Sequence, residues 1–176
     1  MPEPLSDRLD ALRRERDAFL DALARLDAPA RATHPDPDAW SPVEIAEHVY
    51  RAEASTLRGV EKQLAAGEAR KDVGPYRPRA LDLLLAAMEA PKRLKVPEGA
   101  RGIAPEGMPY DDLREAWAGL GPRWDAAAAH PAVDEAPLVR HPMVGALTFE
   151  GAVRFLTAHA ARHRRQLERA IRAVTA

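Results

Sequence analysis

The sequence predicts an all-α protein, a bundle of four long helices with one short extra helix. Ala, Leu, Arg and Glu dominate its composition, whereas β-branched and aromatic residues are scarce. Apolar residues recur at the three- and four-residue spacing of amphipathic helices, and no alternating strand pattern of useful length is present. The 176 residues suit a single domain that spans the whole chain, 1–176.

The first helix is expected from Ser6 to Leu26, because its apolar residues alternate at spacings of four and three. Arg16 interrupts this stripe, which otherwise comprises Leu5, Leu9, Leu12, Phe19, Leu23 and Leu26. We expect the stem of Arg16 to pack against the core while its charged head reaches solvent. Binding of a buried anion by Arg16 is the alternative.

The second helix begins at a capping box, after a Pro/Asp-rich connector over residues 28–40. Ser41 is the cap, Pro42 occupies the first turn, and Glu44 lies three residues after the cap. This helix should end at about Ala66, because Gly67 follows.

The remaining helices are less regular. A short helix is expected over residues 79–90, and a Pro- and Gly-rich stretch over 91–109 follows it. Loops of that length are usually binding loops, lids or disordered segments. A fourth long helix is predicted over 111–129 with a break at Gly121-Pro122. Thr148 is the expected cap of the last helix, which runs to about Val174.

Charge and composition exclude several classes of function. The net charge is −1 with both signs interspersed, so the chain has no basic patch typical of proteins that bind nucleic acid or anionic membranes. No apolar run is long enough for a membrane span, and no signal peptide is evident, which predicts a cytoplasmic protein. The chain has no cysteine, so any metal must bind histidine, carboxylate or water, and any thiol must come from outside.

The last helix carries the clearest chemical signal. On a helical wheel, His159 and His163 fall on the same apolar arc as Leu156 and Leu167, opposite a set of arginines. Imidazoles four residues apart are neighbours on a helix and can share one metal ion. The alternative is a pair of core histidines, each hydrogen-bonded to a neighbouring helix.

The other candidate site residues lie on the inner faces of two helices. His48, at the edge of the apolar arc of the second helix, is the third candidate ligand. Glu53 falls inside that arc, where a carboxylate needs a partner. It could orient a ligand histidine, act as a catalytic base near the metal, or form a salt bridge with an arginine such as Arg16. Gln166 would either hydrogen-bond a ligand histidine or join two helices.

Three further histidines have weaker surroundings. His34 lies in the Pro/Asp-rich connector, His130 at a helix end before a proline, and His141 in a loop before Pro142. We expect each of them to be exposed to solvent or to cap a helix.

Three motifs together resemble the DinB/YfiT-like superfamily. Residues 40–48, WSPVEIAEH, are similar to its second-helix motif. Residues 141–148, HPMVGALT, followed by FLTAH at 155–159 and RHRRQL at 162–167, are similar to its closing motif. The motifs keep the family's order and approximate separation, so the resemblance covers nearly the whole chain.

The resemblance implies a four-helix bundle with long crossover connections and a metal site on His48, His159 and His163. The ion in this family is nickel, zinc, iron or manganese, and many members form homodimers. Characterised members include enzymes that use small thiols such as bacillithiol or mycothiol, as S-transferases or as a maleylpyruvate isomerase, and other members have no known activity. The family name comes from induction by DNA damage and implies no DNA-binding function.

These expectations favour a thiol-dependent S-transferase, in which a divalent ion ionises a small thiol that attacks an electrophile. A hydrolase that uses a metal-bound hydroxide is one alternative. A stress-associated dimer that is stabilised by metal and has no activity is another. In the 91–109 loop, four basic residues could bind carboxylates of the thiol or simply be solvated: Lys92, Arg93, Lys95 and Arg101.

Overall fold

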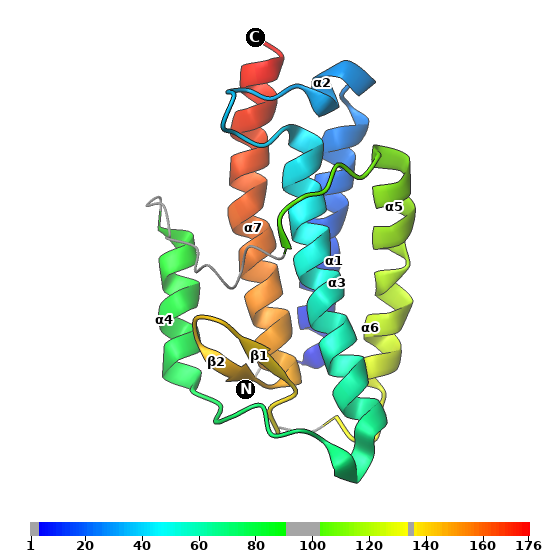
Figure 1. Cartoon of the computed structure of the whole chain (residues 1–176), viewed down its shortest axis with the longest axis vertical. Helices are drawn as coiled ribbons and strands as arrows, with labels where there is room; N and C mark the ends of the chain where they lie inside the picture. Colours follow the sequence, from blue (N-terminus) through cyan, green and yellow to red (C-terminus); the bar gives the residue numbers. More distant parts are fainter. Residues whose placement is uncertain (1–3, 91–102, 134–135) are drawn as a thin grey trace.

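The computed structural model describes residues 4–90, 103–133 and 136–176. Over these residues the main body is a bundle of four helical columns, and a shorter helix lies against it (Figure 1). The columns are α1 (Leu5–Ala24), α3 (Pro42–Ala66), the consecutive pair α5 (Tyr110–Ala118) and α6 (Leu120–Ala128), and α7 (Phe149–Val174). The shorter helix, α4 (Pro78–Glu89), packs on α7. The predicted all-α class with one short extra helix is confirmed.

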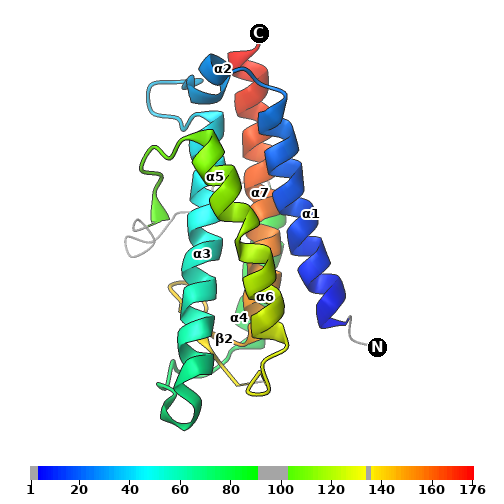
Figure 2. The same ribbon diagram turned by 90° about the vertical axis from the view of Figure 1, so that its right-hand side faces the viewer.

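The connections between the columns are long, as expected. Helices α1 and α7 run in one direction, whereas α3 and the α5–α6 column run in the other (Figures 1 and 2). Because α3 and the α5–α6 column are parallel neighbours, the chain must travel back along the bundle between them. Helix α4 makes the first part of that return (Figure 1).

Local sequence signals explain where the two site-bearing helices begin and end. The Ser41 side chain accepts the backbone N–H of Glu44, and the Glu44 carboxylate accepts that of Ser41, so the capping box is formed. Gly67 ends α3 with a φ of 53°. Thr148 caps α7 by accepting the N–H of Gly151. These three boundaries match the sequence predictions.

The break in the fourth column lies at Gly119, before the predicted position at Gly121-Pro122. Pro122 has no N–H to donate, and its ring would clash with the carbonyl four residues earlier, at Ala118. The helical bonds are therefore interrupted at Ala118, and the proline itself sits in the first turn of α6.

Three minor features were not predicted: a short helix, a β hairpin and a 3-10 turn. Helix α2 (Ala28–Ala32) forms inside the expected connector because Asp27 caps it by accepting the N–H of Ala30. Strands β1 (Val139–His141) and β2 (Gly145–Leu147) form an antiparallel hairpin before α7. Three-residue strands are too short to show a recognisable alternation. A short 3-10 turn, η1 (Gly67–Ala69), follows α3.

The core between the helices is apolar and contains large aromatic side chains, including Phe19, Trp117, Trp124 and Phe149. Within the described ranges, no helix has both the length and the apolar character that a bilayer crossing requires.

A buried carboxylate ties three of the columns together. Glu53 of α3 is 1% exposed, and its Oε1 lies 2.5 Å from Nη2 of Arg16 on α1. The indole N–H of Trp117 on α5 donates to Oε2 at 2.7 Å, and that of Trp124 on α6 donates to Oε1 at 2.9 Å. The predicted salt bridge with Arg16 is formed. The expectation that the head of Arg16 reaches solvent is wrong, because Glu53 provides a buried partner for it.

Removal of Arg16 should destabilise the fold, because the Glu53 carboxylate loses its buried partner. Arg16→Met leaves the Glu53 carboxylate buried without its cation, and we expect a loss of about 3–5 kcal/mol in the free energy of unfolding. Adding Glu53→Gln to this variant removes the charge and keeps an oxygen for one of the two indoles, so the double variant should regain part of the loss. Denaturant unfolding followed by circular dichroism measures both. A double variant no more stable than Arg16→Met would contradict the explanation.

Candidate metal centre

His48 projects from the second turn of α3 toward α7, and contacts on two sides fix its ring. Its Nδ1 lies 2.9 Å from the carbonyl oxygen of Ile103. A carbonyl can only accept, so Nδ1 must carry the proton, and the lone pair of the neutral ring is on Nε2. The indole of Trp40 packs on the other side, with 4.8 Å between ring centroids.

His159 and His163 lie on adjacent turns of α7 and face α3. Nδ1 of His163 donates to Oε1 of Gln166 at 2.9 Å, which again leaves the lone pair on Nε2. The ring of Phe155 stacks on His159 with a centroid distance of 5.5 Å. Gln166 thus hydrogen-bonds a candidate ligand, as one of its two interpretations predicted.

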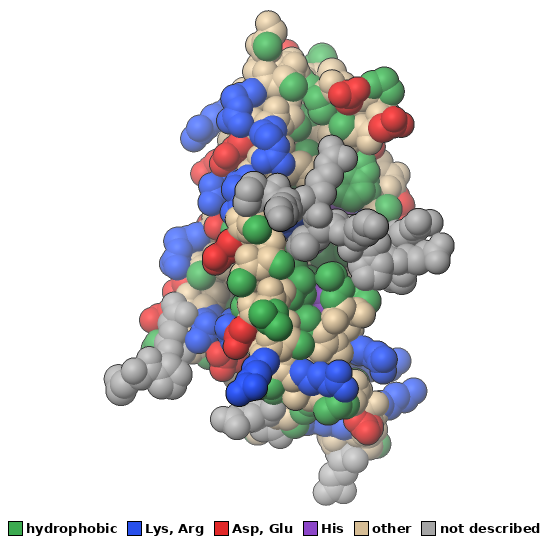
Figure 3. Space-filling model, turned by 90° about the vertical axis from the view of Figure 1, so that its left-hand side faces the viewer, with side chains coloured by type: hydrophobic (Ala, Val, Ile, Leu, Met, Phe, Trp, Pro, Cys, Tyr) green, Lys and Arg blue, Asp and Glu red, His purple; other side chains and the backbone are tan. Residues whose placement is uncertain are grey.

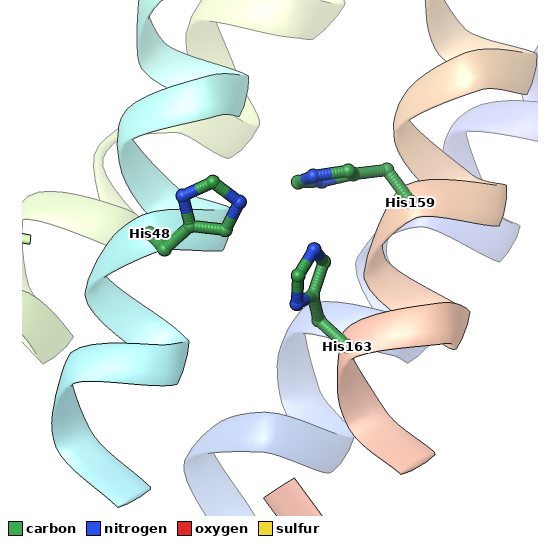
Figure 4. A group of neighbouring side chains, drawn as sticks. All are labelled: His48, His159 and His163. Carbon is green, nitrogen blue, oxygen red and sulfur yellow. The ribbon is translucent and has the colours of Figure 1, made fainter. Parts of the chain in front are cut away.

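The three imidazoles converge on one point between α3 and α7 (Figure 4). Their ring centroids are 4.5–5.1 Å apart, and one nitrogen from each lies within 4.8 Å of the other two. A tetrahedral ion with bonds of about 2.0–2.1 Å would hold such nitrogens roughly 3.4 Å apart. Small rotations of the rings would close that difference.

The hydrogen bonds of the cluster fit a metal ion. His48 and His163 each use Nδ1 for an oxygen acceptor and keep Nε2 for a ligand bond, the arrangement usual for metal-binding histidines. Nδ1 of His159 is buried and has no hydrogen-bond partner among the described residues. An orphaned nitrogen in such a place is costly, and it indicates that something beyond the protein's own hydrogen bonds satisfies this cluster.

The electrostatic setting favours neutral imidazoles, the form that binds metal. Burial lowers the pKa of His48 below its ordinary value. Burial, and then repulsion from the other histidines, holds the pKa of His159 well below that value. Burial, followed by repulsion from His48, lowers the pKa of His163 to about 4. At neutral pH all three rings can therefore offer lone pairs.

Glu47, which the sequence did not single out, anchors the segment that contacts His48. Its buried carboxylate accepts backbone N–H groups from Glu106, Gly107 and Met108 at 2.7–3.0 Å. Residues 47 and 48 therefore hold the same stretch of the crossover, one by its carboxylate and the other by its imidazole. The sequence shows no sign of these contacts, because the partners are about 60 residues apart and are backbone groups.

His141 is also closer to the centre than predicted. It ends β1, is half-buried, and packs on Phe155 with 4.2 Å between ring centroids. The N–H of Met143 donates to its Nδ1, and burial lowers its pKa to about 4. The expectation of an exposed or capping histidine is wrong, because the hairpin folds His141 onto α7.

Two other predictions for the site have different outcomes. Among the described residues, the Glu53 carboxylate is hydrogen-bonded to Arg16 and to two tryptophans and to none of the histidines. These contacts give no support to its suggested catalytic role. The basic residues of the predicted binding loop, Lys92, Arg93, Lys95 and Arg101, lie outside the described residues.

A family comparison accounts for this arrangement. A sequence model of the DinB superfamily matches residues 11–167, nearly the whole chain. The chain belongs to the DinB superfamily. No curated protein and no solved structure matches it significantly. The resemblance seen in the motifs is thus confirmed, and the DinB-type bundle places three histidines where they could bind a metal ion.

Loss of one imidazole should abolish metal binding by this DinB protein. We expect His163→Ala to retain less than a tenth of an equivalent of Zn²⁺ or Ni²⁺ after dialysis, because two imidazoles seldom hold a divalent ion against water, whereas the parent protein should retain about one equivalent. Elemental analysis measures the content. His130→Ala, outside the cluster, is the matched control, and equal metal contents in the two variants would remove His163 from the site.

The metal-free protein should lose stability as the pH falls from about 6.5 toward 4. The pKa values of His48, His159, His163 and His141 are lowered in the folded state, so the unfolded chain binds more protons in this range, which favours unfolding. Urea unfolding at several pH values measures how steeply the free energy of unfolding depends on pH. His163→Gln removes one histidine with a lowered pKa, so this dependence should be less steep in the variant. An unchanged slope would argue against burial of a neutral His163.

Proposed function

We propose that this protein is a metal-dependent S-transferase that joins a small thiol to an electrophile. The observation that carries the proposal is the convergence of three neutral imidazoles in a chain without a cysteine. The chain has no thiol of its own to act as a nucleophile at such a centre, and a thiol from outside would supply one. In the net reaction the thiol sulfur bonds to the electrophilic carbon, the leaving group departs with its electron pair, and the thiol proton goes to solvent.

A divalent ion on His48, His159 and His163 would supply Lewis acidity, which deprotonates a thiol beside it. The protein's part is to hold three neutral nitrogens in a fixed array. The Ile103 carbonyl and Gln166 set the tautomers of two rings.

The surroundings of the centre suit a small apolar electrophile. A groove of about 470 Å³ runs along α3 and the β hairpin to the rings of His141 and Phe155. Phe155 in turn stacks on His159, so the end of the groove lies directly beside the centre. On one face of the molecule a histidine side chain is just visible in a hollow between hydrophobic side chains (Figure 3).

Hydrolysis is the weaker candidate. A general base would assist attack by a metal-bound water, and the carboxylate suggested for this role, Glu53, has its hydrogen bonds with Arg16, Trp117 and Trp124. An inactive homodimer that is stabilised by metal stays a second alternative, and the assay below separates it from both enzymes.

The protein loaded with one equivalent of Zn²⁺ or Ni²⁺ should accelerate the reaction of small thiols with chlorodinitrobenzene. We expect a rate at least tenfold above that of the metal-free protein, because a thiolate reacts and a thiol does not. The absorbance of the thioether product reports the rate. His163→Ala with the same metal addition controls for free ions, and His130→Ala controls for substitution itself. Equal rates for His163→Ala and the parent protein would refute the transferase, and hydrolysis of a nitrophenyl ester without thiol transfer would favour the hydrolase.

A further inference from the structure

Three neighbouring side chains of α3 contact the same short stretch of the chain, residues 103–109, which leads into α5 (Figure 1). We call this stretch the crossover segment. Glu47, His48 and Arg51 each form a hydrogen bond or ion pair with a residue of the segment. The candidate ligand His48 is therefore part of the surface on α3 to which the crossover segment attaches.

The carboxylate of Glu47 makes the main attachment. It is 1% exposed, and it accepts the N–H of Glu106 on one oxygen and those of Gly107 and Met108 on the other. Gly107 has a φ of 87°, a backbone conformation that lets successive N–H groups converge on one anion. Hydrogen bonds to an ionised acceptor are about twice as strong as those between neutral groups.

A second attachment lies at the surface and is weaker. Nη2 of Arg51 is 2.5 Å from Oε1 of Glu106, and Nη1 of Arg51 is 3.7 Å from Oε1 of Glu47. The Glu106 side chain is largely exposed, so water and salt screen its charge, and such pairs contribute little to stability. The buried bonds of Glu47 thus hold the crossover segment on α3.

The position of the crossover segment decides which nitrogen of His48 carries the proton. A neutral imidazole can be protonated on either nitrogen, and the hydrogen bonds of the ring select one of them. The Ile103 oxygen holds the proton on Nδ1, which leaves the lone pair on Nε2, toward the other two histidines (Figure 4). If this oxygen moved away, the proton could shift to Nε2, and that nitrogen could no longer bind a metal ion.

We propose that Glu47 is a positioning residue for the metal centre: by holding the N–H groups of residues 106–108, it keeps the Ile103 carbonyl on Nδ1 of His48 and so keeps that ring in its metal-binding tautomer. Three residues separate Ile103 from Glu106 and span at most about 10 Å, so the carbonyl depends on the nearby attachment. The proposal concerns the candidate metal site and does not depend on thiol transfer.

The coupling acts in both directions. When Nε2 of His48 coordinates a cation, its Nδ1–H becomes a stronger donor to the Ile103 oxygen. Metal binding should therefore stabilise the crossover segment by the same free energy by which the attached segment favours metal binding.

NMR of the imidazole nitrogens in the metal-free protein at neutral pH tests the positioning directly. In the parent protein, His48 and His163 should both carry the proton on Nδ1. In Glu47→Gln one carboxamide oxygen replaces two carboxylate oxygens, so the segment loosens and His48 should populate the tautomer protonated on Nε2. His163, which bonds to Gln166, should not change. A change at both rings, or at neither, would overturn the proposal.

The affinity for Zn²⁺ is the second measurement, made by competition with a zinc-binding dye. Glu47→Gln should raise the Kd about tenfold or more, the range typical for loss of a group that orients a ligand histidine. Glu61→Gln is the matched control, because Glu61 is a glutamate of the same helix that pairs with Arg123 instead. Its Kd should equal that of the parent protein. An unchanged Kd in Glu47→Gln would contradict the positioning role.

Gly107→Ala perturbs the same contact from the other side and leaves α3 intact. A φ of 87° is strained for alanine, so the N–H groups should converge less well and the Kd for Zn²⁺ should rise. Gly74→Ala is its matched control, since Gly74 has a φ of 94° and a Cβ at either glycine would meet no atom within 4 Å. Equal Kd values in the two alanine variants would count against the proposal. Circular dichroism verifies the fold of every variant, and the glycine pair replaces Glu47→Gln should that variant not fold.

Hydrogen exchange tests the reverse direction. Zn²⁺ should slow the exchange of amides 106–108 more than that of Ala30, whose N–H donates to the carboxylate of Asp27. In His163→Ala the ion should have no such effect. Equal slowing at Ala30 and at the crossover segment would refute the coupling. A parent protein that binds no zinc would remove the metal site itself, a failure that the tautomers of the metal-free protein distinguish from a failure of Glu47.

Discussion

The packing of the bundle depends on the hydrogen bonds that satisfy one buried charge, the carboxylate of Glu53. The Glu53 carboxylate lies in an apolar core, where it would be costly without partners. Its three donors come from α1, α5 and α6, so a single side chain of α3 fixes the rotation of the other helices about it. Packing of α7 on α1 and α3 then closes the bundle. The face of α3 that carries His48 is turned toward α7 as a consequence.

The histidine centre differs from the Glu53 carboxylate, because its three side chains are nearly buried and only some of their ring nitrogens have hydrogen-bond partners. Two of the rings find one oxygen acceptor each, and His159 leaves a nitrogen without any. Protonation would not resolve this, since it would place positive charges side by side in a site that burial already makes unfavourable for them. A cation shared by the lone pairs would resolve it.

Sequence patterns predicted much of this structure where the signal is local. Caps at Ser41 and Thr148, the glycine after α3, and the histidine pair on α7 all depend on neighbours within a few residues. Contacts between segments that are far apart in the sequence were harder to predict. The position of Arg16 depends on Glu53, that of His141 on a hairpin too short to be recognised, and the Glu47 contacts involve backbone groups that carry no sequence signature. Gln166 was found because helical periodicity places it on the inner arc of the helix that carries the pair, and His48 because it lies at the edge of the apolar arc of α3.

The acceptor for His48 is a main-chain carbonyl, at Ile103. Every amino acid has the same carbonyl, so residue 103 can drift during evolution without disturbing the ring that it orients. The length of the surrounding segment is constrained instead, because an insertion between residue 103 and the N–H groups that Glu47 accepts would shift that oxygen away from the imidazole. Related proteins should therefore differ in the amino acids of this crossover segment far more than in its length.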